Sequence, residues 1–321
     1  MQGRPQFTAI IPTFNRASIV GRAIDSVLAQ QYKALEIIVV DDGSTDETEK
    51  VLESYGDKIR RFQQANAGVS TARNRGVKEA RCDWIAFLDS DDAWVPEHLS
   101  RMVEAIEATH GGSALYFADL KVADENGETT YWRNCNFAIR GRWQVASRGE
   151  EWTFLRTQPM MLQTSVICRA AYLELGGLAE ELRTREDTLF FYELSLSHAI
   201  CAVSGCGAIQ HADAASRLTR AHDGDSREYR EATTFMYRRL LQKFGPARPE
   251  WRKHFTECLA SAHIDSGRAC LRKGDYWGIL QNLAAASRVS PSTLATQLFD
   301  SLRRKSRSSE ATAIRAHQTG I

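Results

Sequence analysis

Short apolar runs alternate with segments of helical periodicity over the first hundred residues of this 321-residue chain, and this alternation constrains the fold more than any other feature. The runs have the length and composition of buried strands, and the segments between them carry apolar residues three and four positions apart. The predicted strands are Phe7–Pro12, Glu36–Asp41, Ile59–Gln63 and Trp84–Leu88, and the predicted helices are Ser18–Gln30, one that begins at Ser44, and Val69–Ala80. Strands and helices that alternate at this spacing predict an α/β fold with a Rossmann-like parallel sheet.

The fourth predicted strand ends abruptly in carboxylates: Asp89, Asp91 and Asp92 lie within four residues of one another. In an open α/β sheet, ligands bind at the carboxyl ends of the strands, so we expect these acids at the mouth of a site. Like charges this close together are costly unless a cation lies between them. Mg²⁺ and Mn²⁺ prefer carboxylate oxygens and are often shared with substrate phosphates, so the cluster predicts a divalent metal site. For the acids taken alone, a solvated turn that caps a helix near Pro96 is the simpler explanation.

The first two predicted strands also end in polar residues. Residues 11–16 read Ile-Pro-Thr-Phe-Asn-Arg, and the second strand ends in Asp41 and Asp42, after which Gly43 permits a tight turn. An acid at this place suits a hydrogen-bond donor such as a ribose hydroxyl or a base N–H. The same residues also make a good turn and helix cap. The sequence Gly-x-Gly-x-x-Gly is absent after the first strand, so we expect no dinucleotide, whereas a single nucleotide remains open.

Residues 66–76 read Asn-Ala-Gly-Val-Ser-Thr-Ala-Arg-Asn-Arg-Gly. Gly68 marks a loop, Ser70 and Thr71 are candidates for the helix cap, and Arg73 lies on the first turns of the helix. A helix N-terminus together with an arginine suits phosphate oxygens. An ion pair between Arg73 and a nearby aspartate is the alternative.

Four segments together carry a resemblance to a known family. They are Pro-Thr-Phe-Asn-Arg, Val-Asp-Asp-Gly-Ser-Thr-Asp, Asn-x-Gly-x-Ser-x-Ala-Arg-Asn-x-Gly and Phe-Leu-Asp-Ser-Asp-Asp, in this order. The chain resembles the family-2 inverting glycosyltransferases of the GT-A fold, closely over residues 7–100 and more loosely to about residue 215. The resemblance implies an α/β fold with a Rossmann-like, mixed, mainly parallel sheet flanked by helices. An α-helical C-terminal extension would lie outside the catalytic fold.

The resemblance also implies roles for individual residues. The nucleotide-binding residues would be Pro12, Thr13, Asn15, Asp41, Asp42, Arg73, Asp89 and Ser90. Asp41 would bind the base, usually uracil, Asp42 would help to hold that loop, and Asp89 would lie near the ribose. Asp91 would bind the divalent metal, Mn²⁺ or Mg²⁺. Asp92 would support this pair or face the donor sugar.

Glu186-Asp187 is the candidate for the catalytic base. Inverting sugar transfer needs a carboxylate that deprotonates the acceptor hydroxyl and a cation that neutralises the departing diphosphate. The pair follows Leu-Gly-Gly-Leu at 175–178 and precedes Leu-Phe-Phe at 189–191. This resembles the family's Gly-Gly-Phe…Glu-Asp segment, with Leu178 in place of the more usual Phe, and implies Asp187 as the base with Glu186 in support. Acids at a helix N-terminus are common, which is the alternative explanation.

His211 follows an apolar run that ends at Gln210. Relatives often carry a histidine after a strand at this place, so His211 is a candidate to complete the metal shell or to touch the diphosphate. The Ala-Asp-Ala-Ala that follows it is atypical. His222, in a predicted loop over residues 220–225, is a weaker candidate.

We expect two parts in the chain. Residues 1–228 would form the catalytic domain, with a nucleotide-binding half over about 1–120 and a less regular acceptor half over about 121–228. In the acceptor half we expect strands at 113–119 and 163–169, a helix at 187–197, one or two strands over 199–210, and irregular structure over 124–160. Residues 229–321 would be helical, with a hairpin over 260–287 and a disordered tail of about 15 residues.

The two parts differ in charge. Residues 1–228 have a net charge of −8 and residues 229–321 a net charge of +9. A basic region suggests an anionic partner such as a membrane surface, although solvated basic helix faces explain the charge equally well.

No apolar run approaches the roughly 18 residues that a membrane span needs, and the N-terminus lacks a signal-peptide pattern. The seven cysteines are odd in number and lack zinc-finger spacing, so we expect reduced thiols and a cytoplasmic protein. The positive charge of residues 229–321 adds one alternative, peripheral association of the protein with the cytoplasmic face of a membrane.

The expected function is transfer of a hexosyl or N-acetylhexosaminyl group from a nucleotide-sugar, by family frequency a UDP-sugar, to a glycan or lipid-linked acceptor in polysaccharide biosynthesis. We expect no nucleic-acid partner. Processive relatives carry Gln-x-x-Arg-Trp and membrane spans, and their absence from the sequence favours addition of a single sugar. A sugar-phosphate nucleotidyltransferase is an alternative, but it usually has a glycine-rich loop with Arg and Lys after the first strand. A non-catalytic nucleotide-sugar binder would be expected to lack some of Asp89, Asp91 and Asp187.

Overall fold

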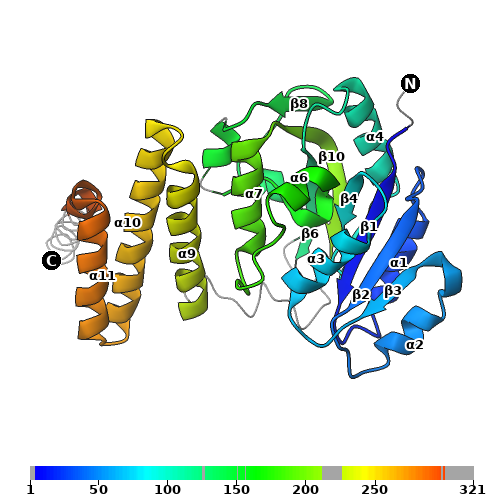
Figure 1. Ribbon diagram of the computed structural model, residues 1–321, viewed down its shortest axis with the longest axis horizontal. Helices are drawn as coiled ribbons and strands as arrows, with labels where there is room; N and C mark the ends of the chain where they lie inside the picture. Colours follow the sequence, from blue (N-terminus) through cyan, green and yellow to red (C-terminus); the bar gives the residue numbers. More distant parts are fainter. Residues whose placement is uncertain are drawn as a thin grey trace, which may run out of the picture. The chain divides into compact units, whose positions relative to one another are not determined.

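The computed structural model describes residues 4–124, 127–149, 151–155, 157–211, 226–297 and 299–300. The chain divides into two compact units, residues 1–221 and 222–321. In the described part, the first unit is a sheet flanked by helices and the second consists of helices (Figure 1). The assignment of residues 1–228 to catalysis stays a prediction.

The nucleotide-binding half predicted from the sequence contains a parallel sheet in the order β3-β2-β1-β4. Its strands are β1 (Phe7–Thr13), β2 (Glu36–Asp41), β3 (Arg60–Gln63) and β4 (Trp84–Phe87), connected through α1 (Val20–Leu28), α2 (Thr48–Glu53), the 3₁₀ helix η1 (Gly56–Lys58) and α3 (Val69–Glu79). The register places Asp41 beside Thr13 on one side and Gln63 on the other. Because these strands run in one direction, their carboxyl ends meet at one edge, as predicted.

Both faces of the sheet are buried at β1, β2 and β4, which explains their nearly continuous apolar sequences, whereas the edge strand β3 is half-buried or exposed. Successive side chains point to opposite faces, so Ile10 and Ile11 of β1 enter different cores. Helix α3 covers the face of Ile10, where a Cβ on Gly76 would approach Ile10 Cγ2 to 2.5 Å. The last glycine of the 66–76 segment is therefore required for close helix–strand packing.

The predicted acceptor half continues the sheet from β4 in the order β9-β6-β10-β5. Its strands are β5 (Asp92–Trp94), β6 (Leu115–Asp124), β7 (Gly127–Thr130), β8 (Trp143–Ala146), β9 (Ser165–Cys168) and β10 (Ile200–Gln210). Its helices are α4 (His98–Ala108), α5 (Tyr131–Asn134), η2 (Glu151–Phe154), η3 (Leu162–Thr164), α6 (Arg169–Glu174) and α7 (Glu186–Ser197). β10 pairs with β6 in parallel, while the pairs of β9, β7, β8 and β5 are antiparallel. The predicted mixed sheet with flanking helices is confirmed.

Three strands of this half differ from the sequence expectation. The region 124–160 was expected to be irregular but includes β7 and β8, and β5 begins at the last acid of the cluster. These strands are only three or four residues long. β8 is mostly half-buried or exposed, and β5 exists through its antiparallel pairing with β10. Strands this short leave no clear period in the sequence, because their partners define them.

His98 at the start of α4 is buried without a hydrogen-bond partner for either ring nitrogen within the described residues. Its ring lies 4.9 Å from that of Trp94, and a Cβ on Gly207 would approach its Nδ1 to 2.6 Å. Burial, with a smaller contribution from Arg101, lowers the pKa of His98 to about 3. The imidazole therefore stays neutral in the folded chain.

This burial makes stability sensitive to acid. Because the unfolded chain takes up a proton at His98 below about pH 6.5 and the folded chain does not, stability should fall as the pH drops below 6.5. Between pH 7.5 and 5, this site should contribute a loss of about 2 kcal/mol. Urea unfolding of the wild type and of His98→Gln at both pH values measures it. An equal loss in the two proteins would show that His98 is not responsible.

The second unit consists, over its described part, of α9 (Arg227–Phe244), α10 (Pro249–Arg272), α11 (Tyr276–Val289) and further helical residues beyond Ser290. Apolar side chains of α9 and α10 are buried, among them Met236, Leu240, Phe255 and Leu259. α10 turns into α11 at Gly274, so the hairpin expected over 260–287 is present. The predicted disordered tail and His222 lie outside the described residues. No helix among those described is both long and apolar enough to cross a membrane.

Candidate active site at the carboxyl edge of the sheet

The loops after β1 and β2 are joined by hydrogen bonds. The amide of Asn15 donates to Ser44 Oγ at 2.8 Å, and Asn15 Oδ1 accepts from the amide of Thr45 at 2.7 Å. Asn15 has a φ of 52°, in the left-handed region that asparagine tolerates better than most residues. The amide of Arg16 donates to Thr48 Oγ1 at 2.9 Å. The side-chain oxygen of Asn15 thus joins two loops, and its contact with a nucleotide stays a prediction.

Asp41 and Thr13, which pair in register, each have a buried polar atom that finds no partner in the described part of the chain. Asp41 Oδ1 accepts from the amide of Ser44 at 3.0 Å and from its Oγ at 2.5 Å. Asp41 Oδ2 and Thr13 Oγ1 have no hydrogen-bond partner within the described residues. Buried polar atoms are nearly always satisfied, so this pair indicates a position for a donor group of a ligand. Pro12 precedes Thr13 and is buried in β1.

The adjacent Asp42 is fully used within the protein. Its Oδ1 accepts from Gln64 Nε2 at 2.8 Å and from the amide of Ala67 at 3.0 Å, and its Oδ2 accepts from the amide of Gly68 at 2.8 Å. Gly43 has a φ of 81°, and a Cβ there would approach the amide nitrogen of Asn66 to 2.9 Å. Asp42 therefore holds the loop that leads into α3, while ligand binding by Asp41 stays a prediction.

A hollow of about 430 Å³ lies beside Asp41, along α2 and β3. It is lined by Asp41, Glu49, Leu52, Gly56, Asp57, Ile59, Arg61, Phe62 and Gln63. Asp41 is the one predicted site residue in this lining, and the acidic cluster lies outside it. The hollow extends the surroundings of Asp41 but does not define the site.

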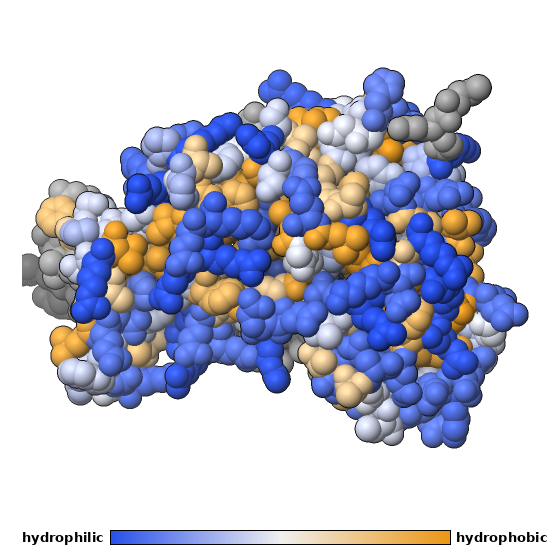
Figure 2. All heavy atoms as spheres, in the orientation of Figure 1, coloured by the Kyte–Doolittle hydropathy of each residue, from blue (hydrophilic) through white to orange (hydrophobic). Residues whose placement is uncertain are grey.

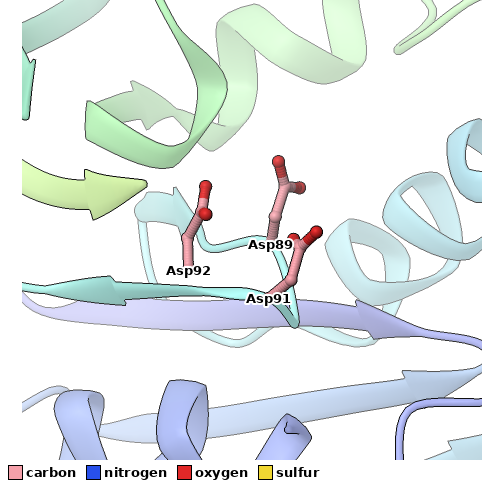
Figure 3. Close-up of side chains that lie close together, drawn as sticks. All are labelled: Asp89, Asp91 and Asp92. Carbon is pink, nitrogen blue, oxygen red and sulfur yellow. The ribbon is translucent and has the colours of Figure 1, made fainter. Parts of the chain in front are cut away.

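Asp89, Asp91 and Asp92 form an acidic cluster at the turn from β4 to β5. One carboxylate oxygen from each lies within 4.8 Å of the others, and the three side chains rise from the same side of the turn (Figure 3). Three hard oxygen donors at this spacing fit Mg²⁺ or Mn²⁺. Among the described residues, this is the one cluster with the spacing of a metal site.

Asp91 and Asp92 have different hydrogen-bond and ion-pair partners. Asp91 lies 3.8 Å from Arg16 Nη2, and its backbone oxygen accepts from Arg22 Nη2 at 2.7 Å. Asp92 is buried, and its Oδ2 accepts from Gln163 Nε2 at 3.3 Å. Asp92 therefore faces the protein more than Asp91 does. Ser90, between Asp89 and Asp91 in the sequence, is also buried.

Gln163 was not a candidate in the sequence. It lies in η3, and its backbone oxygen accepts from the indole Nε1 of Trp94 at 2.9 Å, which brings η3 under the acidic turn. The sequence placed Gln163 at the start of a strand. No local pattern marks it as a partner of Asp92, because the contact depends on sheet order.

Arg73 joins the acidic cluster to α7. Its Nη2 lies 2.6 Å from Asp89 Oδ1, and its Nη1 lies 3.2 Å from Glu186 Oε1. Burial disfavours the charge of Arg73, but the attraction of Asp89 and Glu186 is stronger and raises its pKa above the ordinary value. The ion pair with an aspartate, which the sequence left as an alternative to phosphate binding, is present.

Glu186 and Asp187 occupy the first turn of α7, after Arg185, whose φ of 65° is unusual for a side-chain-bearing residue. Glu186 is buried, and burial together with the neighbouring Asp187 raises its pKa to about 7 against the opposing effect of Arg73. Asp187 is half-buried, and its Oδ1 accepts from the amide of Thr188. Two adjacent carboxylates therefore have different environments: Glu186 faces Arg73 in the interior, and Asp187 is accessible.

The segment before α7 is fixed to α3 by Asn74. Its Oδ1 accepts from Tyr172 Oη at 2.6 Å and from the amide of Leu178 at 3.0 Å, and its Nδ2 donates to the backbone oxygen of Leu178 at 2.9 Å. Gly177 has a φ of 78°, and a Cβ there would approach Asn74 Oδ1 to 2.5 Å. Arg73 and Asn74, adjacent in the 66–76 segment, thus both bind the region that contains Glu186-Asp187.

His211 directly follows Gln210, which pairs with Asp92 across β10 and β5. The register therefore places the His211 backbone next to the acidic turn. Its side chain is half-buried and is not one of the three clustered ligands. Metal coordination by His211 stays a prediction.

Comparison with known proteins gives one family. Residues 8–166 match the model of "Glycosyl transferase family 2". An uncharacterised glycosyltransferase of Rickettsia bellii is 37% identical over 129 residues, 40% of this chain and 19% of that protein. The uncharacterised glycosyltransferase YibD of Escherichia coli is 30% identical over 180 residues, 55% of this chain and 45% of that protein. The chain thus spans less than half the length of these relatives.

Among solved structures, the chain is similar to residues 1–349 of TarS from S. aureus in complex with UDP-GlcNAc. The TM-score is 0.69 at 20% sequence identity, and the match covers 90% of this chain and 82% of that one. At this identity, the match shows the fold, which is the GT-A fold.

Proposed function

The chain belongs to glycosyltransferase family 2 through its residues 8–166, and we propose that it transfers a sugar with inversion from a UDP-sugar to a glycan or lipid-linked acceptor. The observation that carries this proposal is the bridge through Arg73. It joins Asp89 of the acidic cluster to Glu186, the neighbour of Asp187, which supports one site for the proposed donor-binding acid and the proposed base. The UDP-GlcNAc bound to TarS supports a uridine nucleotide.

The donor would bind along the carboxyl edge. Asp41 Oδ2 suits a base N–H, and Asp89, half-exposed beside Arg73, suits a ribose hydroxyl. Asp91, with Asp89, would hold Mn²⁺ or Mg²⁺, which when bound neutralises charge on the diphosphate. Asp42 and Asn15 keep the loops around the nucleotide in place.

Asp187 would act as the base. Its Oδ1 is engaged with Thr188, which leaves Oδ2 to accept the proton of the acceptor hydroxyl. The acceptor oxygen then bonds to the anomeric carbon while the bond from that carbon to the diphosphate breaks on the opposite face. The products are the glycosylated acceptor with inverted configuration, the nucleoside diphosphate and a proton on Asp187.

Calorimetric titration with UDP, GDP and dTDP, with and without Mn²⁺, tests the donor site. We expect Mn²⁺-dependent binding of UDP to the wild type, weakened at least about tenfold in Asp91→Ala because a metal ligand is lost. Asp83→Ala is the matched control, since Asp83 is an exposed acid at the opposite end of β4 and should leave binding unchanged. If no nucleotide binds the folded wild type, the donor site is wrong. If GDP or dTDP binds in preference, the choice of uridine is wrong.

A further inference from the structure

The hairpin between α10 and α11 ends in an exposed apolar and basic surface, which we name the hairpin tip. It comprises Leu271, Arg272, Lys273, Tyr276, Trp277 and Leu280. Tyr276 is 74% exposed and Trp277 69%, and Leu271 and Leu280 are 59% and 60% exposed. Four large apolar side chains this exposed within ten residues are unusual for a surface that only water covers. In Figure 2 apolar and pale side chains lie among blue ones at this end of the hairpin.

Hydrogen bonds define the backbone of the tip. Gly274 has a φ of 72°, and its amide donates to the backbone oxygen of Leu271, while the amide of Asp275 donates to that of Cys270. Asp275 Oδ1 then accepts from the amide of Gly278 at 2.8 Å and caps α11. The carboxylate of Asp275 is thereby used within the turn. Tyr276 and Trp277 are thus exposed directly after a hydrogen-bonded turn, at the start of α11.

The chemistry of the tip favours one partner. Tyrosine and tryptophan combine an apolar ring with a polar group, which suits the boundary between head groups and acyl chains of a bilayer. Arg272 and Lys273 lie in the same turn, so cations lie where anionic head groups would meet the surface. An exposed hairpin end with aromatic and basic side chains resembles an interfacial anchor.

We propose that the hairpin tip docks the protein peripherally on an anionic membrane surface, with Tyr276 and Trp277 at the interface and Arg272 and Lys273 on the head groups. This goes beyond the proposed transfer reaction. It would place a transferase that uses a lipid-linked acceptor on the surface where that acceptor lies.

Trp277 provides a direct signal for the test. The other six tryptophans are buried or half-buried, so Trp277 should dominate the fluorescence emission that comes from solvent-exposed tryptophan. With vesicles of phosphatidylglycerol and phosphatidylcholine, we expect the emission to shift to the blue and brominated lipid to quench it. Vesicles of phosphatidylcholine alone should bind at least about tenfold more weakly, because they lack the anionic attraction.

Variants separate docking from general charge. Arg272→Glu/Lys273→Glu should weaken vesicle binding at least about tenfold, since both cations lie at the surface. Arg252→Glu/Lys253→Glu is the matched control, because it makes the same charge change at exposed positions near the other end of α10 and should have a much smaller effect. Trp277→Ser should abolish the shift and weaken binding.

Three outcomes would overturn the proposal: equal binding to both vesicle types, equal effects of the two double variants, or a blue shift that rises with protein concentration in the absence of vesicles. The last would assign the tip to a second copy of the chain. UDP binding in solution should be the same in all these variants. A failure to bind vesicles would therefore not contradict the proposed sugar transfer. A wild type that does not bind UDP would equally leave the vesicle result unchanged.

Discussion

Replacement of Asp187 with asparagine is expected to lower kcat for sugar transfer by about 10²–10⁴-fold, the range that a general base contributes. The amide oxygen of asparagine can still accept from Thr188, so the first turn of α7 should form normally. Asparagine cannot take a proton from the acceptor hydroxyl. The measurement is steady-state transfer with a nucleotide-sugar and an acceptor found by screening, together with calorimetric binding of UDP.

UDP binding by Asp187→Asn should equal that of the wild type, because the proposed donor contacts come from Asp41, Asp89 and Asp91. Glu174→Gln is a suitable control, since Glu174 is an exposed acid on α6 outside the site. Its kcat should be unchanged. A transfer rate near that of the wild type in Asp187→Asn would remove Asp187 from the role of base and direct attention to Glu186.

The sequence predicted the strands of the nucleotide half and the positions of their ends well, because these signals are local. Each strand end is marked by an abrupt change from apolar to polar residues, and parallel strands then bring these ends to one edge. Asp41, Asp42 and the cluster from Asp89 to Asp92 could therefore be placed on the sheet without knowledge of any long-range contact.

The residue pattern alone does not separate the tasks of neighbouring acids, whereas the family resemblance assigned Asp41 to the base and Asp42 to the loop. Asp41 and Asp42 have the same chemistry, yet within the described residues one oxygen of Asp41 has no partner, while Asp42 accepts from the loop before α3. This difference follows from strand alternation and loop position together. The contact of Gln163 with Asp92 and the brief strand β5 depend on the antiparallel return of β10, for which no local pattern exists.

Arg73 also shows which contacts cannot be predicted from the sequence. Its place on the first turns of α3 was predictable, and so was a choice between a phosphate and a carboxylate as its partner. The bridge to Glu186, 113 residues further along the chain, was not predictable from periodicity. It requires that α3 and α7 cover the same face of the sheet, as their side chains in one apolar core show.

Replacement of Arg73 with methionine is therefore expected to have a large effect on stability, a loss of about 3–5 kcal/mol, because it leaves Glu186 buried without its cation. The pKa of Glu186 is already raised, and loss of Arg73 should raise it further. A buried acid with a raised pKa binds its proton more tightly in the folded chain than in the unfolded one. The variant should thus lose more stability at pH 8 than at pH 5.5, as urea unfolding at both values will show.

A double-mutant cycle separates this electrostatic effect from lost packing. In Arg73→Met/Glu186→Gln no buried charge remains unpaired at this position, so the double variant should be more stable than Arg73→Met by a margin that grows with pH. Arg73→Lys should recover only part of the loss, since an ammonium group cannot reach Asp89 and Glu186 with the geometry of a guanidinium. If the two single losses simply add and show no dependence on pH, the bridge contributes packing alone. In that case the variants should reduce sugar transfer only by reducing the fraction of folded protein. The link that we infer between donor binding and the base would then not be electrostatic.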